Sequence, residues 1–262
     1  MNIRLDNKNA VVCGSSKGIG FAIARQYAEM GANVTMLSRS EENLKKAISE
    51  LSQNGKQNHT YIANDFIKPQ PVIDVFNENI KNGTDYHILV NNSGGPAPGL
   101  VSEAEPKEFL EAFQRHVIMS QLLAKTLLPG MKKNEYGRII NVISISVKQP
   151  VENLGVSNTI RGAMNSWSKT LSREVAQYGI TVNNILPGHT KTERLESLFI
   201  NNAKKQGISP EEFADKVRSQ IPAKRFAKPE ELAYLAGFLA SDRASFVNGV
   251  SIPVDGGYVK GF

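Results

Sequence analysis

The sequence has few of the features that would place it outside ordinary globular proteins. Its 262 residues contain one cysteine, Cys13, which excludes an internal disulfide and is compatible with a reducing cytosol. No apolar stretch of about 18 residues occurs, so no membrane span is expected. The first residues, Met1-Asn2-Ile3-Arg4-Leu5-Asp6, lack the apolar segment of a signal peptide. We therefore predict a cytoplasmic protein.

Charge of one sign is not concentrated anywhere along the chain. The formal net charge is +6, and the basic residues are scattered, with no basic tail and no interleaved aromatics. This pattern indicates a solvated surface and no nucleic-acid partner. The alternative is a preference for acidic ligands such as phosphate-bearing acyl carriers. No metal site is predicted.

Short apolar runs alternate with segments of helical spacing along the whole chain. Strands are expected at 9–13, 34–37, 61–63, 87–90, 138–143, 181–186 and 250–253. Helices are expected at 18–30, 41–53, 70–81, 106–131, 155–177 and 229–240. This alternation predicts an α/β fold: one Rossmann-type domain over 1–262, with a doubly wound parallel sheet and helices on both faces. Its ligands should lie at the carboxyl ends of the strands, where the strand order reverses.

Glycines follow the first expected strand. Gly14, Gly18 and Gly20 lie between that strand and the first helix. Such glycines allow a tight turn and a close approach to a pyrophosphate, which the helix-start amides then face. A glycine triplet alone is weak support, because turns use glycine anyway.

Three further motifs follow at characteristic spacing: Asn91-Asn92-Ser93-Gly94, Leu186-Pro187-Gly188 and Asp255-Gly256-Gly257. With the glycine loop they resemble the short-chain dehydrogenase/reductase family over nearly the whole chain, and its 3-oxoacyl-acyl-carrier-protein-reductase-like members in particular. The resemblance implies an NAD(P)-binding domain. It also implies a set of cofactor-binding residues: Gly14, Ser16, Lys17, Gly18, Ile19, Gly20, Arg39, Asp65, Asn91, Gly94, Pro187 and Gly188.

The resemblance gives two of these residues a more specific role. Asp65 matches the family residue beside the adenine, and the alternative is an aspartate that caps the next helix. Asn91 matches an asparagine that ties the central strands together.

The end of the second expected strand distinguishes between the two nicotinamide cofactors. NAD enzymes place an acid there to bind the ribose 2′-hydroxyl, whereas this chain has Ser38-Arg39 and no acid before Glu41. A carboxylate would repel a 2′-phosphate, and an arginine can pair with it in a bidentate way. Lys17 adds a second cation. We therefore predict NADP(H) rather than NAD(H). The alternative is that both cations are ordinary solvated charges.

The family's reaction centre is largely replaced. In the family a tyrosine exchanges a proton with the substrate oxygen, a lysine one helical turn later holds the ribose, and a serine orients the carbonyl. Ser144 matches the serine, but the tyrosine and lysine positions hold Ser157 and Arg161, and no tyrosine lies between Tyr136 and Tyr178. A serine hydroxyl is a far weaker acid than a phenol. Arginine stays charged, yet it can hold a ribose hydroxyl or stabilise an oxyanion.

A histidine offers a substitute proton carrier. The family's asparagine on the preceding long helix falls on His116, whose side-chain type titrates near neutral pH. One hypothesis is a rebuilt site, in which Ser144 and Ser157 orient the substrate, Arg161 anchors ribose and charge, and His116 relays the proton. The alternative is a buried structural histidine.

The segment 189–225 is long and polar and follows the expected ligand edge. Such an insertion is typical of a substrate lid, with Leu195, Leu198 and Phe199 as candidates to line the pocket. The alternative is a helical hairpin that only packs on the core. By resemblance, the long helices and the C-terminal segment would form the interfaces of a homotetramer.

Three functions remain open from the sequence. The first is an atypical NADP(H)-dependent oxidoreductase acting on a carbonyl or alcohol of a small molecule, with an acyl thioester as one candidate substrate. The second is a cofactor-binding protein without hydride transfer, acting as a sensor or assembly partner. A lyase or isomerase that reuses the pocket is the third. The retained Ser144 favours the enzyme.

Overall fold

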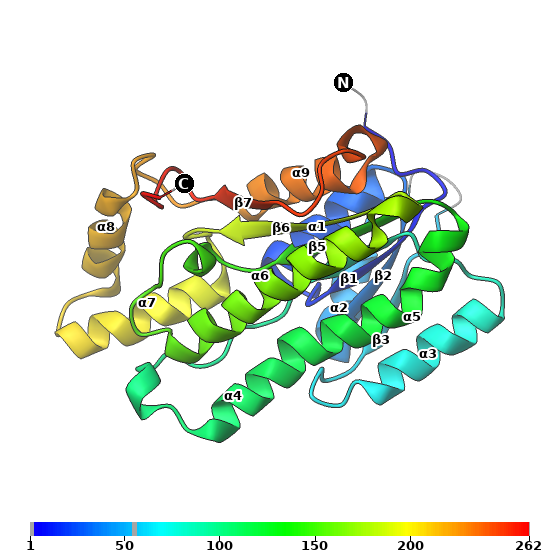
Figure 1. Cartoon of the computed structure of the whole chain (residues 1–262). Coiled ribbons are helices and arrows are strands. Elements are labelled where there is room, and N and C mark those ends of the chain that lie inside the picture. Colours follow the sequence, from blue (N-terminus) through cyan, green and yellow to red (C-terminus); the bar gives the residue numbers. More distant parts are fainter. Residues whose placement is uncertain (1–2, 54–56, 262) are drawn as a thin grey trace.

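A parallel sheet forms the centre of the molecule. In the computed structural model, which describes residues 3–53 and 57–261, it contains β1 (Asn9–Cys13), β2 (Asn33–Ser38), β3 (Thr60–Ala63), β4 (Ile88–Asn91), β5 (Gly137–Val142), β6 (Ile180–Pro187) and β7 (Ser251–Val254). The strand order is β3-β2-β1-β4-β5-β6-β7, and neighbouring strands run parallel (Figure 1). The order reverses between β1 and β4. The predicted doubly wound α/β fold is confirmed.

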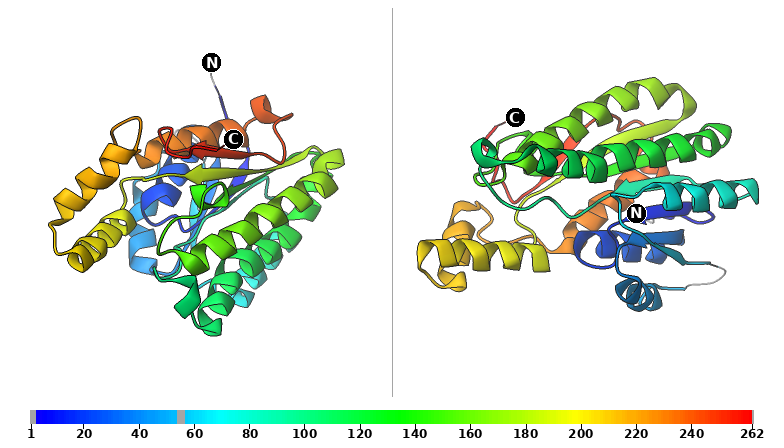
Figure 2. Two further views of the ribbon diagram at one scale, coloured as in Figure 1. Left: turned by 60° about the vertical axis from the view of Figure 1, so that its left-hand side comes forward. Right: turned by 90° about the horizontal axis from the view of Figure 1, so that it is seen from below.

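Helices cover both faces of the sheet, as Figure 2 shows. One face carries α1 (Gly18–Glu29), α2 (Glu41–Ser49) and α9 (Pro229–Ala240), whose apolar stripes supply Tyr27, Leu44 and Leu239 to one buried cluster. The other face carries α3 (Gln70–Lys81), α5 (Met119–Lys133) and α6 (Gly155–Val175), which contribute to a second cluster. The helix expected over 41–53 ends early, because Leu51 turns into the first cluster.

The helix expected over 106–131 is not uniform. It consists of α4 (Pro106–Phe113), the π-helical turn η2 (Gln114–Ile118) and α5. A π turn widens the helix locally and is frequent at functional sites. This turn carries His116, whose side chain is buried.

The expected lid segment folds into two helices, α7 (Glu193–Gln206) and α8 (Pro210–Gln220), which extend beyond the end of the sheet in Figure 2. They have their own apolar cluster, in which the ring of Phe199 lies 5.3 Å from that of Phe226. Phe199 therefore stabilises this helix pair. The first turn of α7 lies against the glycine loop, because Glu193 pairs with Lys17.

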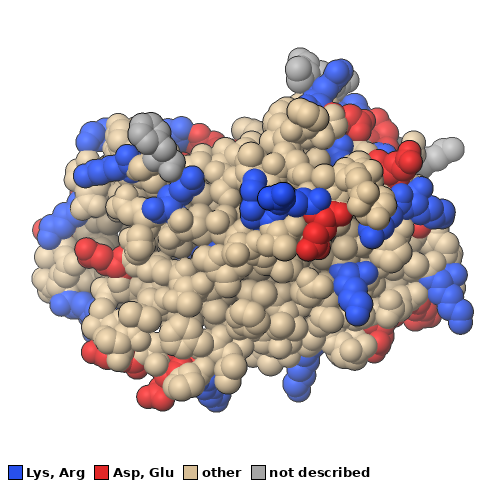
Figure 3. Space-filling model, in the orientation of Figure 1, with Lys and Arg blue, Asp and Glu red and all other residues tan. Residues whose placement is uncertain are grey.

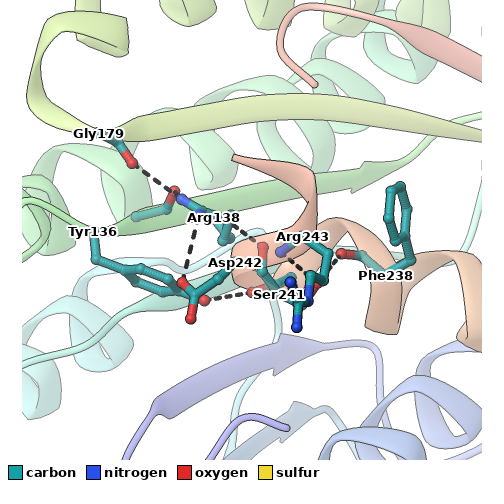
Figure 4. A network of polar contacts seen from close by, with 9 residues as sticks. Tyr136, Arg138, Gly179, Phe238, Ser241, Asp242 and Arg243 are labelled. Carbon is teal, nitrogen blue, oxygen red and sulfur yellow. Dashed lines mark hydrogen bonds and ion pairs between the residues drawn. The ribbon is translucent and has the colours of Figure 1, made fainter. Parts of the chain in front are cut away.

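The opposite end of the sheet is held by a polar network around Arg138, at the start of β5 (Figure 4). This buried side chain donates to the carbonyls of Gly137, Gly179 and Ser241 and stacks on the ring of Tyr136. The Tyr136 hydroxyl donates to the carbonyl of Ala240. The network joins α9 to the sheet far from the strand ends that carry the motifs.

No helix in the described part of the chain is long and apolar enough to cross a membrane. On the face drawn in Figure 3, charged side chains of both signs are scattered over the upper part and along the edges, and the lower middle is largely uncharged.

Candidate functional site

A cleft of about 370 Å³ opens at the carboxyl ends of β1 and β4, where the strand order reverses. Parallel sheets of this type bind their ligands at that place. Most of the residues predicted to bind a cofactor line it: Gly14, Ser16, Lys17, Gly18, Ile19, Arg39, Asp65 and Gly94.

The glycines shape this cleft in different ways. Gly14 and Gly18 have φ values of +56° and +59°, which favour glycine. A Cβ on Gly20 would lie 2.2 Å from the carbonyl oxygen of Gly14, so Gly20 lets α1 pack closely on the loop. A Cβ on Gly94, in contrast, would meet no protein atom within 4 Å, because Gly94 borders open space.

The start of α1 can receive an anion. Lys17 occupies the N-cap position without a side-chain capping bond, so the amides of the first turn stay available. Together with the space beside Gly94, this arrangement fits the pyrophosphate and the nicotinamide half of a dinucleotide. The residues present therefore suit the predicted cofactor.

The remaining predicted cofactor residues lie beside the cleft. Asn91 donates to Asn141 at 2.8 Å, and Asn141 donates to Asn184 at 2.9 Å, so amides link β4, β5 and β6 across the sheet. Pro187 ends β6, and Gly188 packs on Asp255. The structure brings these residues to the same sheet edge without placing them in the cleft lining.

The charged residues of the cleft are only partly paired. Lys17 pairs with Glu193, and Arg115 lies 3.7 Å from the carboxylate of Asp65. Asp65 also accepts from the backbone of Ile67, and the next helix begins only at Gln70, so Asp65 does not cap it. Arg39 is exposed and has no hydrogen bond or ion pair to any described residue.

Behind the cleft is an inner cavity of about 20 Å³, enough for about one water molecule. Its walls include Cys13, Asn91, His116 and Arg161, and it shares Ser93 and Arg115 with the cleft. The structure thus brings together two of the four predicted catalytic residues, His116 and Arg161.

His116 is held as a neutral ring. Its Nδ1 is hydrogen-bonded to Ser93 Oγ at 2.8 Å, and its buried Nε2 has no partner of good geometry among the described residues. Burial lowers the pKa of His116 well below its usual value, and the charges of Arg161, Arg194 and Arg115 lower it further, weakly opposed by the Gly94 backbone. His116 is therefore not protonated near neutral pH. A general acid works best when its pKa lies near the working pH, and His116 does not meet this condition.

Arg161 remains a cation in the interior. It is 9% exposed, and its Nη1 donates to the carbonyl of Val142 at 3.2 Å. Burial, with a smaller contribution from Arg194, lowers the pKa of Arg161 to about 10, which still leaves it charged at neutral pH.

The two predicted serines lie elsewhere. Ser144 Oγ accepts from the backbone of Ser146 at 3.0 Å and caps the short turn Ile145–Val147. Ser157 is buried on α6. Among the described residues lining the cleft and the inner cavity, neither serine appears.

The structure adds residues that the sequence did not single out: Ser93, Arg115, Glu193 and Arg194. Ser93 stands inside a recognised motif, and Arg115 adjoins His116, so both had a weak signal. Arg194 had none, because it belongs to the first turn of α7 and reaches the cleft only through the packing of that helix. There it donates to the carbonyls of Gly95 and Pro96 at 2.9 and 3.1 Å.

The described residues form neither a metal-binding cluster nor a reactive thiol. No group of three or more His, Cys, Asp or Glu side chains that could hold a metal ion occurs within 3–53 and 57–261. Burial raises the pKa of the Cys13 thiol to about 12, so the reactive thiolate is absent at neutral pH.

Comparison with known proteins identifies the family of the chain. The family model described as enoyl-(acyl carrier protein) reductase matches residues 14–259. The chain belongs to the short-chain dehydrogenase/reductase family, a family of oxidoreductases, which confirms the resemblance seen in the motifs.

Three individual proteins show how similar the chain is to known reductases. The chain is 30% identical to the NADPH-dependent reductase BacG of Bacillus subtilis, over 98% of this chain and 99% of the relative. It is 32% identical to the 3-oxoacyl-[acyl-carrier-protein] reductase FabG of Vibrio cholerae, over 97% and 98%. The crystal structure of L-sorbose reductase from Gluconobacter frateurii, complexed with NADPH and L-sorbose, matches all of both chains with 33% identity and a TM-score of 0.93.

Proposed function

We propose that the protein is an NADP(H)-dependent oxidoreductase that interconverts a carbonyl and an alcohol on a small molecule without the tyrosine of its family. The observation that carries this proposal is the cleft lined by the glycine loop, which adjoins an inner cavity walled by a buried cation, Arg161. The relatives named as NADPH-dependent support the choice of cofactor.

The chain would distinguish NADP(H) from NAD(H) through Arg39. This side chain lies on the cleft, is exposed and has no partner among the described residues. Its guanidinium is thus free for a 2′-phosphate, while Lys17 is engaged by Glu193. The cofactor, when bound, supplies or accepts the hydride.

Arg161 would supply the electrostatic part of the reaction. A fixed cation in a site of low dielectric stabilises an oxyanion more strongly than it would in water. Arg161 meets this condition because it is buried and held by the carbonyl of Val142. His116 and Ser93 would orient the substrate oxygen by hydrogen bonds as a neutral pair, and water entering from the cleft would deliver the proton.

A second candidate function is cofactor binding without hydride transfer, in a sensor or an assembly partner. The low pKa of His116 favours it, because the described site then holds no side-chain acid that titrates near neutral pH. Serine at position 157 cannot take over the role of the missing phenol.

Two measurements separate these candidates. NADPH binding is first measured by fluorescence, with NADH as the comparison. NADPH oxidation is then followed by absorbance across ketones, sugars, oxo acids and acyl thioesters. Oxidation with any of them supports the enzyme, tight binding without oxidation supports the second candidate, and failure to bind NADPH contradicts both.

Three further proposals concern the surroundings of the site. The segment 189–225 would act as a substrate lid, supported by the contacts of Arg194 and Glu193 with the cleft loops. An acyl thioester is a candidate substrate, supported by the likeness to FabG. A homotetramer is expected from the family and is supported by the exposed Leu110 and Phe113 on α4.

A further inference from the structure

Two arginines converge where the cleft meets the inner cavity. A Cβ on Gly95 would lie 2.7 Å from Nη2 of Arg194 and 3.7 Å from Nη2 of Arg161. Both guanidinium groups therefore border one small volume, although they come from α7 and α6.

Neither cation is neutralised. Arg161 donates to the carbonyl of Val142, and Arg194 donates to the carbonyls of Gly95 and Pro96. No carboxylate of a described residue pairs with either of them. Each guanidinium has five N–H donors, so several donors stay open. Two neighbouring cations of the cleft, Lys17 and Arg115, in contrast, have acidic partners.

Such an arrangement is unfavourable in the absence of an anion. Burial penalises the charge of Arg161, and the positive charge of the solvent-exposed Arg194 adds a smaller repulsion. Charged groups whose pKa is shifted by burial and by neighbouring charges occur preferentially at functional sites. The anionic groups of a bound cofactor would have other partners, since Arg39 is free for a 2′-phosphate and the start of α1 is available to a pyrophosphate.

On the basis of the proposed function, we infer that the substrate carries a carboxylate, which is bound between Arg161 and Arg194. The planar fork of a guanidinium matches the two oxygens of a carboxylate. The space between the two guanidinium groups is so narrow that a Cβ on Gly95 would already lie 2.7 Å from Arg194, which favours this small planar group over a tetrahedral phosphate. Oxo acids and hydroxy acids then bind better than the corresponding neutral ketones and alcohols.

Arg194 also connects substrate binding with the lid. Because it belongs to the first turn of α7, a carboxylate that pairs with it holds the start of α7 against the loop at 94–96. Arg194 is thereby assigned as a specificity-determining residue for the proposed reaction.

The test measures binding rather than turnover. The protein is saturated with NADP⁺ and titrated by calorimetry with oxalate, with neutral oxamide of similar shape, and with inorganic phosphate. We expect oxalate to bind and oxamide to bind at least about 10-fold more weakly, since a hydrogen bond to a charged group has that effect. Absence of oxalate binding, equal binding of oxamide, or tighter binding of phosphate would overturn the assignment.

Variants of single arginines show whether oxalate binds at Arg194. Arg194→Gln should weaken oxalate binding by about 10- to 100-fold, with an intermediate loss in Arg194→Lys, which keeps the charge but lacks the fork. Arg173→Gln, an exposed arginine on α6, should change nothing and serves as the matched control. Unchanged oxalate affinity in Arg194→Gln, or an equal loss of NADP⁺ affinity, contradicts the inference.

The cofactor titration distinguishes two kinds of failure. If NADP⁺ does not bind to the parent protein, the proposed function fails. If NADP⁺ binds normally and oxalate does not, only the carboxylate site fails. The oxalate–oxamide comparison in the parent protein needs no variant and therefore does not depend on how the variants fold.

Discussion

His116 and Ser93 form a hydrogen-bonded pair, with Nδ1 and Oγ 2.8 Å apart, that joins the π turn of the long helix to the loop after β4. Ser120, in the first turn of α5, donates to the carbonyl of His116 at 2.6 Å. Ser93 lies in the wall shared by the cleft and the inner cavity, and His116 lines the inner cavity. A titratable side chain has thus been placed where burial and three arginines keep it neutral.

The pH dependence of stability should reveal this neutral histidine. In the unfolded chain His116 takes up a proton as the pH falls through about 6.5, whereas its folded-state pKa lies well below that value. Between the two values the unfolded state binds more protons, so folded-state stability falls as the pH falls, by up to about 1.4 kcal/mol per pH unit. Above about pH 6.5 the contribution is constant.

Urea unfolding of the parent protein and of His116→Gln at pH 7.5 and pH 5 measures this effect. The variant should lose less stability between the two pH values than the parent does. The lowered pKa values of His87 and His189 affect both proteins alike and cancel in the comparison. Identical losses would contradict the assigned state of His116.

Gly94→Ala should separate folding from cofactor binding. The added methyl group meets no protein atom within 4 Å, so the free energy of unfolding should change by less than about 0.5 kcal/mol. NADPH affinity should fall at least about 10-fold, because the methyl group occupies space assigned to the cofactor. Both quantities are obtained from urea unfolding and fluorescence titration.

Gly20→Ala is the matched comparison. Its methyl group would lie 2.2 Å from the carbonyl oxygen of Gly14, so a destabilisation of about 1–3 kcal/mol is expected from overpacking. Unchanged NADPH binding in Gly94→Ala would mean that the cofactor does not lie beside Gly94.

Arg39→Glu should reverse the cofactor preference. The variant loses a charge-assisted hydrogen bond to the 2′-phosphate and gains a repulsive carboxylate, so NADPH affinity should fall by about 10- to 100-fold. NADH affinity should be kept or improved, since an acid in this place can accept from the ribose 2′-hydroxyl. Arg173→Glu, with the same charge change on an exposed surface, should leave both titrations unchanged. An equal loss of NADPH affinity in Arg173→Glu would mean that the added negative charge acts from anywhere on the surface, and not through contact with the 2′-phosphate.

The double variant Ser157→Tyr with Arg161→Lys tests whether a proton donor limits turnover. If it does, reduction of a ketone substrate should accelerate by about 10²–10⁴, the usual contribution of a general acid. Ser157→Phe with Arg161→Lys is the control, because it has the same bulk at the buried position 157 and lacks the hydroxyl. Equal rates in the two variants would mean that the rest of the pocket has diverged as well.

Arg138→Met should destabilise the fold and leave the site intact. The variant removes the arginine donor from the carbonyls of Gly179 and Ser241, of which Ser241 keeps the amide of Ala244, and it removes the stacking on Tyr136. A loss of about 2 kcal/mol is expected from these lost interactions. NADPH affinity should stay the same, since the network lies at the other end of the sheet. Calorimetric unfolding measures the loss of stability, and fluorescence titration measures NADPH affinity. A change of NADPH affinity would contradict the prediction that Arg138 supports the fold alone.

The sequence predicted the sheet well because each strand is a short apolar run between helical segments, a pattern set by local burial. The helices 70–81 and 229–240 begin and end where expected. The long helix at 106–131 was predicted without its π turn. That turn depends on which side chains must face the cavity, and helical periodicity does not report it.

The glycine loop shows what can be derived from residue types alone. Gly14, Gly18 and Gly20 have no side chain, so their role in a tight turn follows from backbone sterics. The same is true of the missing tyrosine, because position 157 holds serine whatever the packing. The likeness to NADPH-dependent reductases agrees with the cofactor predicted from the charge at Arg39.

The sequence by itself therefore determined the fold and the family, and it predicted the place of the cofactor and the replacement of the family's tyrosine by Ser157. Only the tertiary structure decided that His116 is neutral, that Ser144 and Ser157 lie outside the cavity walls, and that Arg194 approaches Arg161. The reason is physical. Backbone preferences and burial patterns act over a few residues, whereas a pKa and the meeting of two charges depend on groups brought together by folding.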